Sequence, residues 1–110
     1  MSTSDTSKIA ALNDQFRTTG IGGQFLMSAG IAALPYAELA AIMYRVRNFA
    51  DFTPDNDPHG EHDFGSFTFG AETIFWKIDC YDPSLQFGSE DPANPEVTAR
   101  VLTVMFAREY

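Results

Sequence analysis

The alternation of apolar and polar residues between positions 66 and 81 constrains the fold of this chain more than any other feature. Phe67 and Phe69 alternate with small polar residues, Gly70-Ala71 is typical of a turn, and a β-branched and aromatic run follows over Thr73–Tyr81. This pattern predicts an antiparallel hairpin. Because alternate residues of a strand share one face, the core side of the second strand is predicted to consist of Ile74, Trp76, Ile78 and Cys80.

Helical spacing is present near the start of the chain. Ile9, Leu12 and Phe16 recur three and four residues apart, which predicts a short amphipathic helix from about residue 8 to Arg17. The polar residues 1–7 lack this spacing, and we expect them to be flexible.

One strand and two more helices complete the prediction. A short apolar run between glycines predicts a strand over residues 24–28. Pro35 suits the first turn of a helix, whose core face would hold Leu39, Ile42, Met43, Val46 and Phe49. Asn94 as cap and Pro95 behind it predict a last helix, although its β-branched content leaves a strand as the alternative. The core face of that helix would hold Val97, Val101, Val104 and Met105.

The order of these elements defines the expected fold class. A chain of 110 residues can build one core, so we predict a single domain over residues 1–110. The order α-β-α-β-β-α predicts an α+β fold in which about three helices pack on a small, mainly antiparallel sheet of about three strands.

The acidic residues are concentrated in the middle of the chain. Between residues 48 and 99 there are eleven acids and one base, Lys77, whereas the rest of the chain holds four acids and six bases. Such a surface repels phosphates, which disfavours direct binding to nucleic acid, and it attracts a basic protein surface or a metal cation. The predicted partner-binding residues are Asp51, Asp55, Asp57, Glu61, Asp82, Glu90 and Asp91.

The loop before the hairpin contains both histidines of the chain. Imidazoles and carboxylates this close together can ligate Zn²⁺ or Mn²⁺, and the candidate ligands are His59, Glu61, His62 and Asp63. In the alternative interpretation, which we favour, these side chains hold the loop through hydrogen bonds and no cofactor is bound. In that case His62, next to the strand, should be more buried than His59, which lies between Pro58 and Gly60.

The sequence lacks motifs that are typical of several classes of enzyme and of membrane or secreted proteins. The sequence has no phosphate-binding glycine loop and no serine nucleophile elbow, so we assign no catalytic residues and favour a non-enzymatic protein, with enzymatic activity left open. It has no apolar stretch of membrane-spanning length and no signal peptide, and its single cysteine, Cys80, lies in an apolar run. We therefore expect a protein of the cytoplasm, with no membrane partner and with Cys80 as a buried apolar residue.

Four segments of the chain resemble a family of short bacterial proteins classed as a domain of unknown function. They are Ile9–Arg17, Asp55–Gly65, Phe75–Asp79 and Arg100–Met105, and the resemblance extends over nearly the whole chain. The block Asn-Asp-Pro-x-Gly-Glu-His-Asp-Phe-Gly at residues 56–65 is specific to that family. Many members are encoded on plasmids and other mobile elements, which implies a setting in which small acidic proteins often inhibit CRISPR or restriction systems.

Three functional hypotheses follow. The first is a non-enzymatic acidic inhibitor or adaptor that binds a basic protein surface of nucleic-acid-handling machinery. The second is a small divalent-metal-binding protein or metal-dependent hydrolase centred on residues 57–63. The third is a structural or regulatory module whose acidic loop is merely solvated. The identity of the partner and the oligomeric state are left open.

Overall fold

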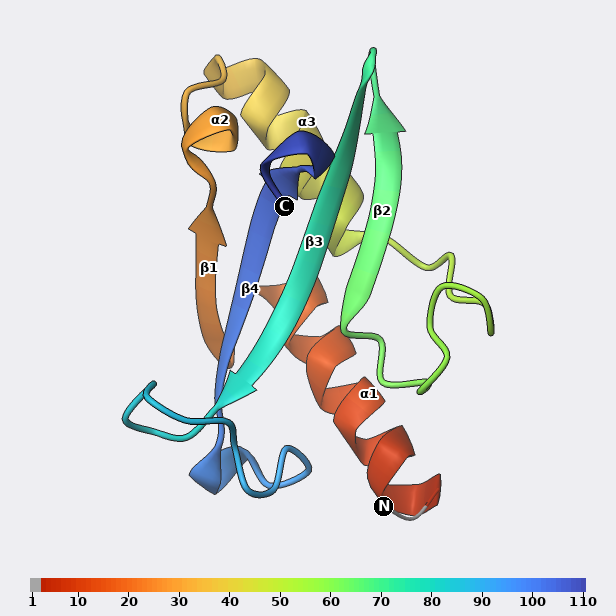
Figure 1. The fold of residues 1–110 in the computed structure, drawn as a ribbon, viewed down its shortest axis with the longest axis vertical. Helices are drawn as coiled ribbons and strands as arrows, with labels where there is room; N and C mark the ends of the chain where they lie inside the picture. The colour runs from red at the N-terminus through yellow and green to blue at the C-terminus, as the bar shows by residue number, and fades with distance from the viewer. Residues whose placement is uncertain (1–2) are drawn as a thin grey trace.

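The computed structural model describes residues 3–110 (Figure 1). Its elements are α1 (Thr3–Thr19), β1 (Gly23–Met27), α2 (Ala29–Ala32), α3 (Tyr36–Arg47), β2 (Phe64–Phe69), β3 (Glu72–Tyr81), the 3₁₀ turn η1 (Pro95–Val97), β4 (Ala99–Phe106) and the 3₁₀ turn η2 (Ala107–Glu109). This is the α+β fold class predicted from the sequence, with a fourth strand in the sheet. None of the helices within residues 3–110 is both long enough and apolar enough to cross a membrane.

The four strands form one mixed sheet in the order β1-β4-β3-β2. β2 and β3 are the predicted antiparallel hairpin, with Phe67 opposite Ile74 and the turn at Gly70-Ala71. β4 pairs antiparallel with β3 and parallel with β1, so it lies in the interior of the sheet.

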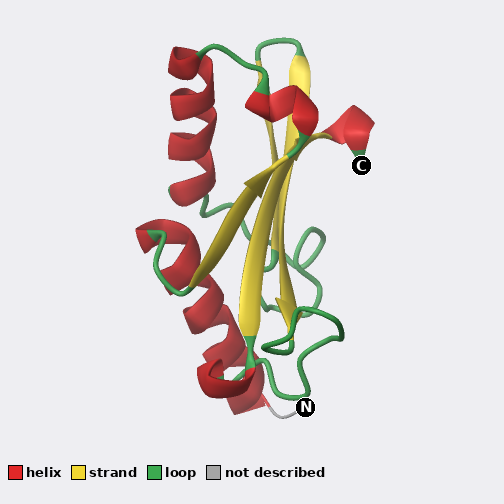
Figure 2. Cartoon of the chain, turned by 90° about the vertical axis from the view of Figure 1, so that its left-hand side faces the viewer, coloured by secondary structure: helices red, strands yellow, loops and turns green. Residues whose placement is uncertain are grey.

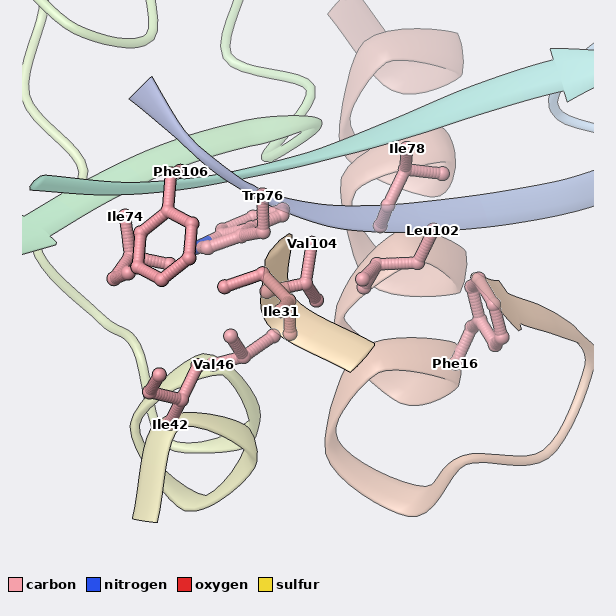
Figure 3. Packing of buried hydrophobic residues seen from close by; sticks show 10 residues of the cluster. All are labelled: Phe16, Ile31, Ile42, Val46, Ile74, Trp76, Ile78, Leu102, Val104 and Phe106. Carbon is pink, nitrogen blue, oxygen red and sulfur yellow. The ribbon is translucent and has the colours of Figure 1, made fainter. Parts of the chain in front are cut away.

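The helices α1 and α3 cover one face of the sheet, as Figure 2 shows from the side. The core lies between them and the sheet (Figure 3) and contains Phe16, Ile31, Ile42, Val46, Ile74, Trp76, Ile78, Leu102, Val104 and Phe106. Ile74, Trp76 and Ile78 are all buried, which confirms the predicted core face of the second hairpin strand, and Cys80 is half-buried at its end.

The prediction of a last helix is wrong, because residues 99–106 form β4. Asn94 does act as a cap and accepts a hydrogen bond from the Glu96 backbone, but it caps only the single turn η1. β4 is buried on both faces, so it lacks the polar-apolar alternation of a strand with one solvent-exposed face. Val101 and Met105 are buried on one face and Leu102 and Val104 on the other. The spacing of the apolar residues in this run therefore also fits one face of a helix.

The remaining elements match the prediction closely. The strand predicted over 24–28 is β1, and the helix predicted after Pro35 is α3. The first helix is longer than expected, since residues 3–7 belong to α1; the expectation of flexibility for residues 1 and 2 lies outside the described residues. α2, which the sequence pattern did not indicate, begins at Ser28, whose side chain accepts a hydrogen bond from Ile31 N.

Candidate functional site at the acidic end of the sheet

Two loops meet the sheet at the end where β2 begins and β3 ends (Figure 1). They are residues 51–63 and residues 82–98, called here the acidic loops. The first contains five acids and the second four, and neither contains a lysine or an arginine. Nine of the fifteen acids of the chain are thus placed in two loops at one end of the molecule.

Helix α1 lies beneath the first acidic loop and fixes its position. The buried side chain of Asn13 donates a hydrogen bond from Nδ2 to the Glu61 carbonyl at 2.9 Å. One turn along, the Asp14 carboxylate contacts the His62 ring, with Nδ1 at 3.0 Å from Oδ1 and 2.9 Å from Oδ2. These contacts join residues 48 positions apart in the sequence, so the conformation of the loop depends on the helix.

His62 has an unusual backbone conformation within the first acidic loop. Its φ of 55° lies in the left-handed region, which is uncommon for a residue other than glycine. The Asp57 carboxylate accepts its backbone N–H at 3.3 Å, and the Phe52 ring stacks on the imidazole at 3.9 Å between ring centres. The contacts on both backbone and ring hold this residue in its strained conformation. His62 is half-buried and His59 is exposed, as predicted.

The structure removes Asp57 from the predicted partner surface. Asp57 is only 9% exposed, and its carboxylate faces His62 inside the loop, where Oδ2 also lies 3.6 Å from His62 Nε2. In the sequence Asp57 is one acid among several, and only the folded loop shows that its charge is directed inward. The other predicted partner residues lie in the acidic loops with exposed or half-buried side chains; they are Asp51, Asp55, Glu61, Asp82, Glu90 and Asp91.

The proposed metal ligands occupy different positions in the loop. His62 directs Nδ1 at Asp14, whereas His59 lies in the exposed turn and Asp63 precedes β2, where its carbonyl accepts a hydrogen bond from Ile78 N. Across residues 3–110, no three His, Cys, Asp or Glu side chains are grouped in an arrangement that could hold a metal ion. The hydrogen bonds of the loop match the interpretation in which its histidine and acids serve to hold the chain.

Two arginines that count as bases in the sequence are buried beneath the acidic loops. Arg17, 2% exposed, donates from Nη1 to the carbonyls of Val46 and Arg47, and its guanidinium lies 4.9 Å from the centre of the Trp76 ring. Arg100, 3% exposed, donates from Nε to Asn13 Oδ1 at 2.8 Å.

Arg17 thus binds the last carbonyls of α3, Arg100 binds loop backbone, and both contribute little positive charge to the surface. Arg100 also donates to the Pro92 carbonyl, which ties the second acidic loop to β4 and through Asn13 to α1. Lys77 and Arg108 are on the surface but pair with Asp79 and Glu72. Because two bases and one acid, Asp57, are buried, the surface is more acidic than the net charge of −8 suggests.

Crowding at the acidic end disfavours the ionised form of two carboxyl groups. Partial burial raises the pKa of Asp63, and the carboxylates of Asp57 and Asp79 raise it further. Partial burial also raises the pKa of Glu61, and the neighbouring Asp63 adds to the effect. The same end holds Cys80, whose thiol pKa is raised by burial, so its reactive thiolate is disfavoured.

The sequence analysis did not assign roles to the α1 residues that organise this end. A signal was present, since Asn13 and Arg17 follow Ile9 by four and eight residues and so occupy the apolar stripe of the helix. Polar residues at core positions of an amphipathic helix indicate a buried hydrogen-bond network, because an unpaired buried polar group is unfavourable.

Comparison with known proteins places the chain in one family. Residues 27–109 match the family model described as protein of unknown function (DUF3768), and the chain belongs to that family. No curated protein and no solved structure gives a significant match. All of α1, with Asn13, Asp14 and Arg17, precedes the matched range, whereas both acidic loops lie within it.

The loop contacts predict how the protein responds to His62→Ala. We expect a loss of about 1–3 kcal/mol in the free energy of unfolding, since the Asp14 carboxylate loses its contact with the imidazole, although it keeps Arg17, and Phe52 loses its stacked ring. Urea denaturation with and without EDTA measures the loss, and the chelator should not change it. His59→Ala, in the exposed turn, is the matched control and should leave stability nearly unchanged. Stabilisation of the wild type by Zn²⁺ or Mn²⁺ that disappears in His62→Ala would contradict this interpretation.

Proposed function

We propose that this chain is a non-enzymatic acidic inhibitor or adaptor that acts in the cytoplasm on nucleic-acid-handling machinery of basic surface, such as an anti-CRISPR or anti-restriction protein of a mobile element. The observation that carries the proposal is the charge of the acidic loops. They hold nine acids, all but Asp57 exposed or half-buried, and no lysine or arginine, while Arg17 and Arg100 are buried below them. Such a surface can steer toward a site built to hold phosphates and compete for it.

The electrostatics of this end also favour a cationic partner. Asp63 and Glu61 have raised pKa values because each is partly desolvated beside other carboxylates. An ammonium or guanidinium group placed among these carboxylates would offset their mutual repulsion. Arginine would gain most, because its planar guanidinium can donate two parallel hydrogen bonds to one carboxylate.

The acidic loops are held in place without a partner. The first is bound to α1 through Asn13 and Asp14, and the second is bound to β4 through Arg100. Binding by a loop that is already ordered loses less conformational entropy than binding by a flexible one. The rigid loops therefore support a role in recognition, where charges must be presented in a fixed pattern.

Charge reversal on the acidic loops tests the proposal. The triple variant Asp51→Lys, Asp55→Lys and Glu90→Lys changes exposed side chains, so we expect normal folding and association slowed by about tenfold or more. The measurement is inhibition of DNA cleavage by a panel of purified CRISPR effector nucleases and restriction enzymes, followed by binding kinetics at low and high salt with any enzyme inhibited. High salt should reproduce the loss by screening the charges.

Single variants distinguish the effect of a charge in the acidic loops from the effect of net charge. Asp55→Lys and Glu38→Lys change the charge by the same amount at exposed positions, one in an acidic loop and one in the first turn of α3. Only the first should weaken inhibition. Equal weakening by both variants, or inhibition that is indifferent to salt and to the triple variant, would refute the proposed role of the acidic loops.

A further inference from the structure

The outer face of α3 carries the most exposed large hydrophobic side chains of the described helices. Tyr36 is 85% exposed and Tyr44 69%, and the alanines between them, Ala37, Ala40 and Ala41, are exposed as well. The opposite face of the helix supplies the fully buried core residues Ile42 and Val46. Figure 2 shows α3 in the outer layer, with its far side turned away from the sheet.

This face differs in composition from an ordinary solvent-exposed helix face, which is normally charged. Tyr36, Ala40 and Tyr44 follow one another at intervals of four residues and form a continuous uncharged ridge. The charged residue Arg45 points elsewhere, since its guanidinium donates to the Thr68 carbonyl. Tyrosine is enriched in the buried centres of protein interfaces, where its ring packs and its hydroxyl finds a hydrogen-bond partner.

We propose that the outer face of α3 binds the same face of a second copy of this chain, with the two helices antiparallel about a two-fold axis near Ala40. The ridge is symmetric about Ala40, with one tyrosine four residues before it and one four residues after it. An antiparallel pair therefore places Tyr36 of each copy beside Tyr44 of the other. A two-fold interface requires such self-complementarity, because one patch must fit itself.

Charge favours a second copy over a basic partner at this face. Two chains of net charge −8 repel each other through most of their surfaces, and most strongly through the acidic loops. The tyrosine-alanine ridge carries no acid that would repel a second copy or attract a basic protein, and Arg47 lies in the last turn of the same helix. The acidic loops and the ridge are separate surfaces, so a dimer would carry two acidic ends.

The area available fits a dimer that dissociates on dilution. A tyrosine buries roughly 150–250 Å² when fully covered, so the four tyrosines of a pair would bury about 600–1,000 Å². The alanines add to this area and allow the helix axes to approach to about 8 Å. The sum is near the lower limit of about 1,200 Å² for stable interfaces, and a dissociation constant in the micromolar range is expected.

Cysteine crosslinking at the proposed two-fold axis tests the arrangement. In a Cys80→Ala background, Ala40→Cys brings two thiols together across the axis, and diamide, which accepts the two hydrogen atoms, should convert most of the protein to a disulfide-linked dimer. Ala71→Cys, in the exposed turn between β2 and β3, is the matched control and should crosslink far less. Equal crosslinking of the two variants would overturn the proposal.

Sedimentation of the chain without added cysteines tests the interface independently. The wild type should pass from monomer to dimer between about 1 and 100 μM. Ala40→Glu should shift this transition at least tenfold upward by opposing two carboxylates at the axis, whereas Ala71→Glu should not. Both alanines are exposed, so circular dichroism should show native folding. A wild type that stays monomeric at 100 μM, or a dimer insensitive to Ala40→Glu, would overturn the proposal without affecting the acidic loops.

Discussion

Replacing Trp76 with alanine is expected to lower the free energy of unfolding by about 3–5 kcal/mol, through lost burial and the cavity left behind. Trp76 is fully buried on β3 at the centre of the core (Figure 3), in edge contact with Phe49 and Phe52 and below the guanidinium of Arg17. Chemical denaturation of the purified variant measures the loss. An unchanged unfolding transition would remove Trp76 from the core.

The matched variant Trp76→Phe keeps most of the apolar volume and should destabilise much less. Among the described residues, Trp76 Nε1 has no hydrogen-bond partner, so phenylalanine also removes an unsatisfied donor. The indole lies directly against Gly65 on β2, where a methyl group in place of the glycine hydrogen would overlap the ring. A small side chain is therefore required opposite Trp76.

Replacing Asn13 with leucine is expected to lower the free energy of unfolding by about 3 kcal/mol, although the two side chains are similar in size. The change leaves Arg100 Nε without its acceptor and the Glu61 carbonyl without its donor, and the Arg100 guanidinium is buried. Because Asn13 links the first acidic loop to α1, amide hydrogen exchange should also become faster in residues 57–63.

An exposed position on the same helix provides the control. Gln15→Leu, two residues away, should change stability by less than about 0.5 kcal/mol. If Asn13→Leu is as stable as the wild type, the buried polar network does not hold the loop. Faster exchange spread evenly over the whole chain, with no excess in residues 57–63, would likewise contradict the role given to Asn13.

The sequence was sufficient to predict those parts of the fold whose pattern is local. The β2–β3 hairpin alternates in polarity with a turn at Gly70-Ala71, and α3 has a clean apolar stripe, so both were predicted with nearly correct bounds. β4 was not, because its residues are buried on both faces of the sheet and so lack that alternation. Its identity depends on pairing with β1 and β3, which no local window contains.

The candidate site was predictable in composition and not in arrangement. The concentration of acids in residues 51–63 and 82–98 is visible in the sequence, and the greater burial of His62 followed from its place beside the strand. The inward direction of Asp57 and the burial of Arg17 and Arg100 depend on contacts between segments far apart in the chain. Counting charges treats every acid and base as exposed, which these three residues are not.

The parallel pairing of β1 with β4 determines when the chain can complete its fold during synthesis. β1 is the first strand of the sheet to be made and its neighbour β4 is the last, since Gly23 pairs with Arg100 and Met27 with Val104. The β2–β3 hairpin joins adjacent segments and can form as soon as both have emerged. Insertion of β4 between β1 and β3 must then be a late step. Until that step β1, which carries Leu26, and β4, which carries Val104, are not paired with each other. The nascent chain is therefore exposed to proteases and to aggregation until β4 has emerged and paired.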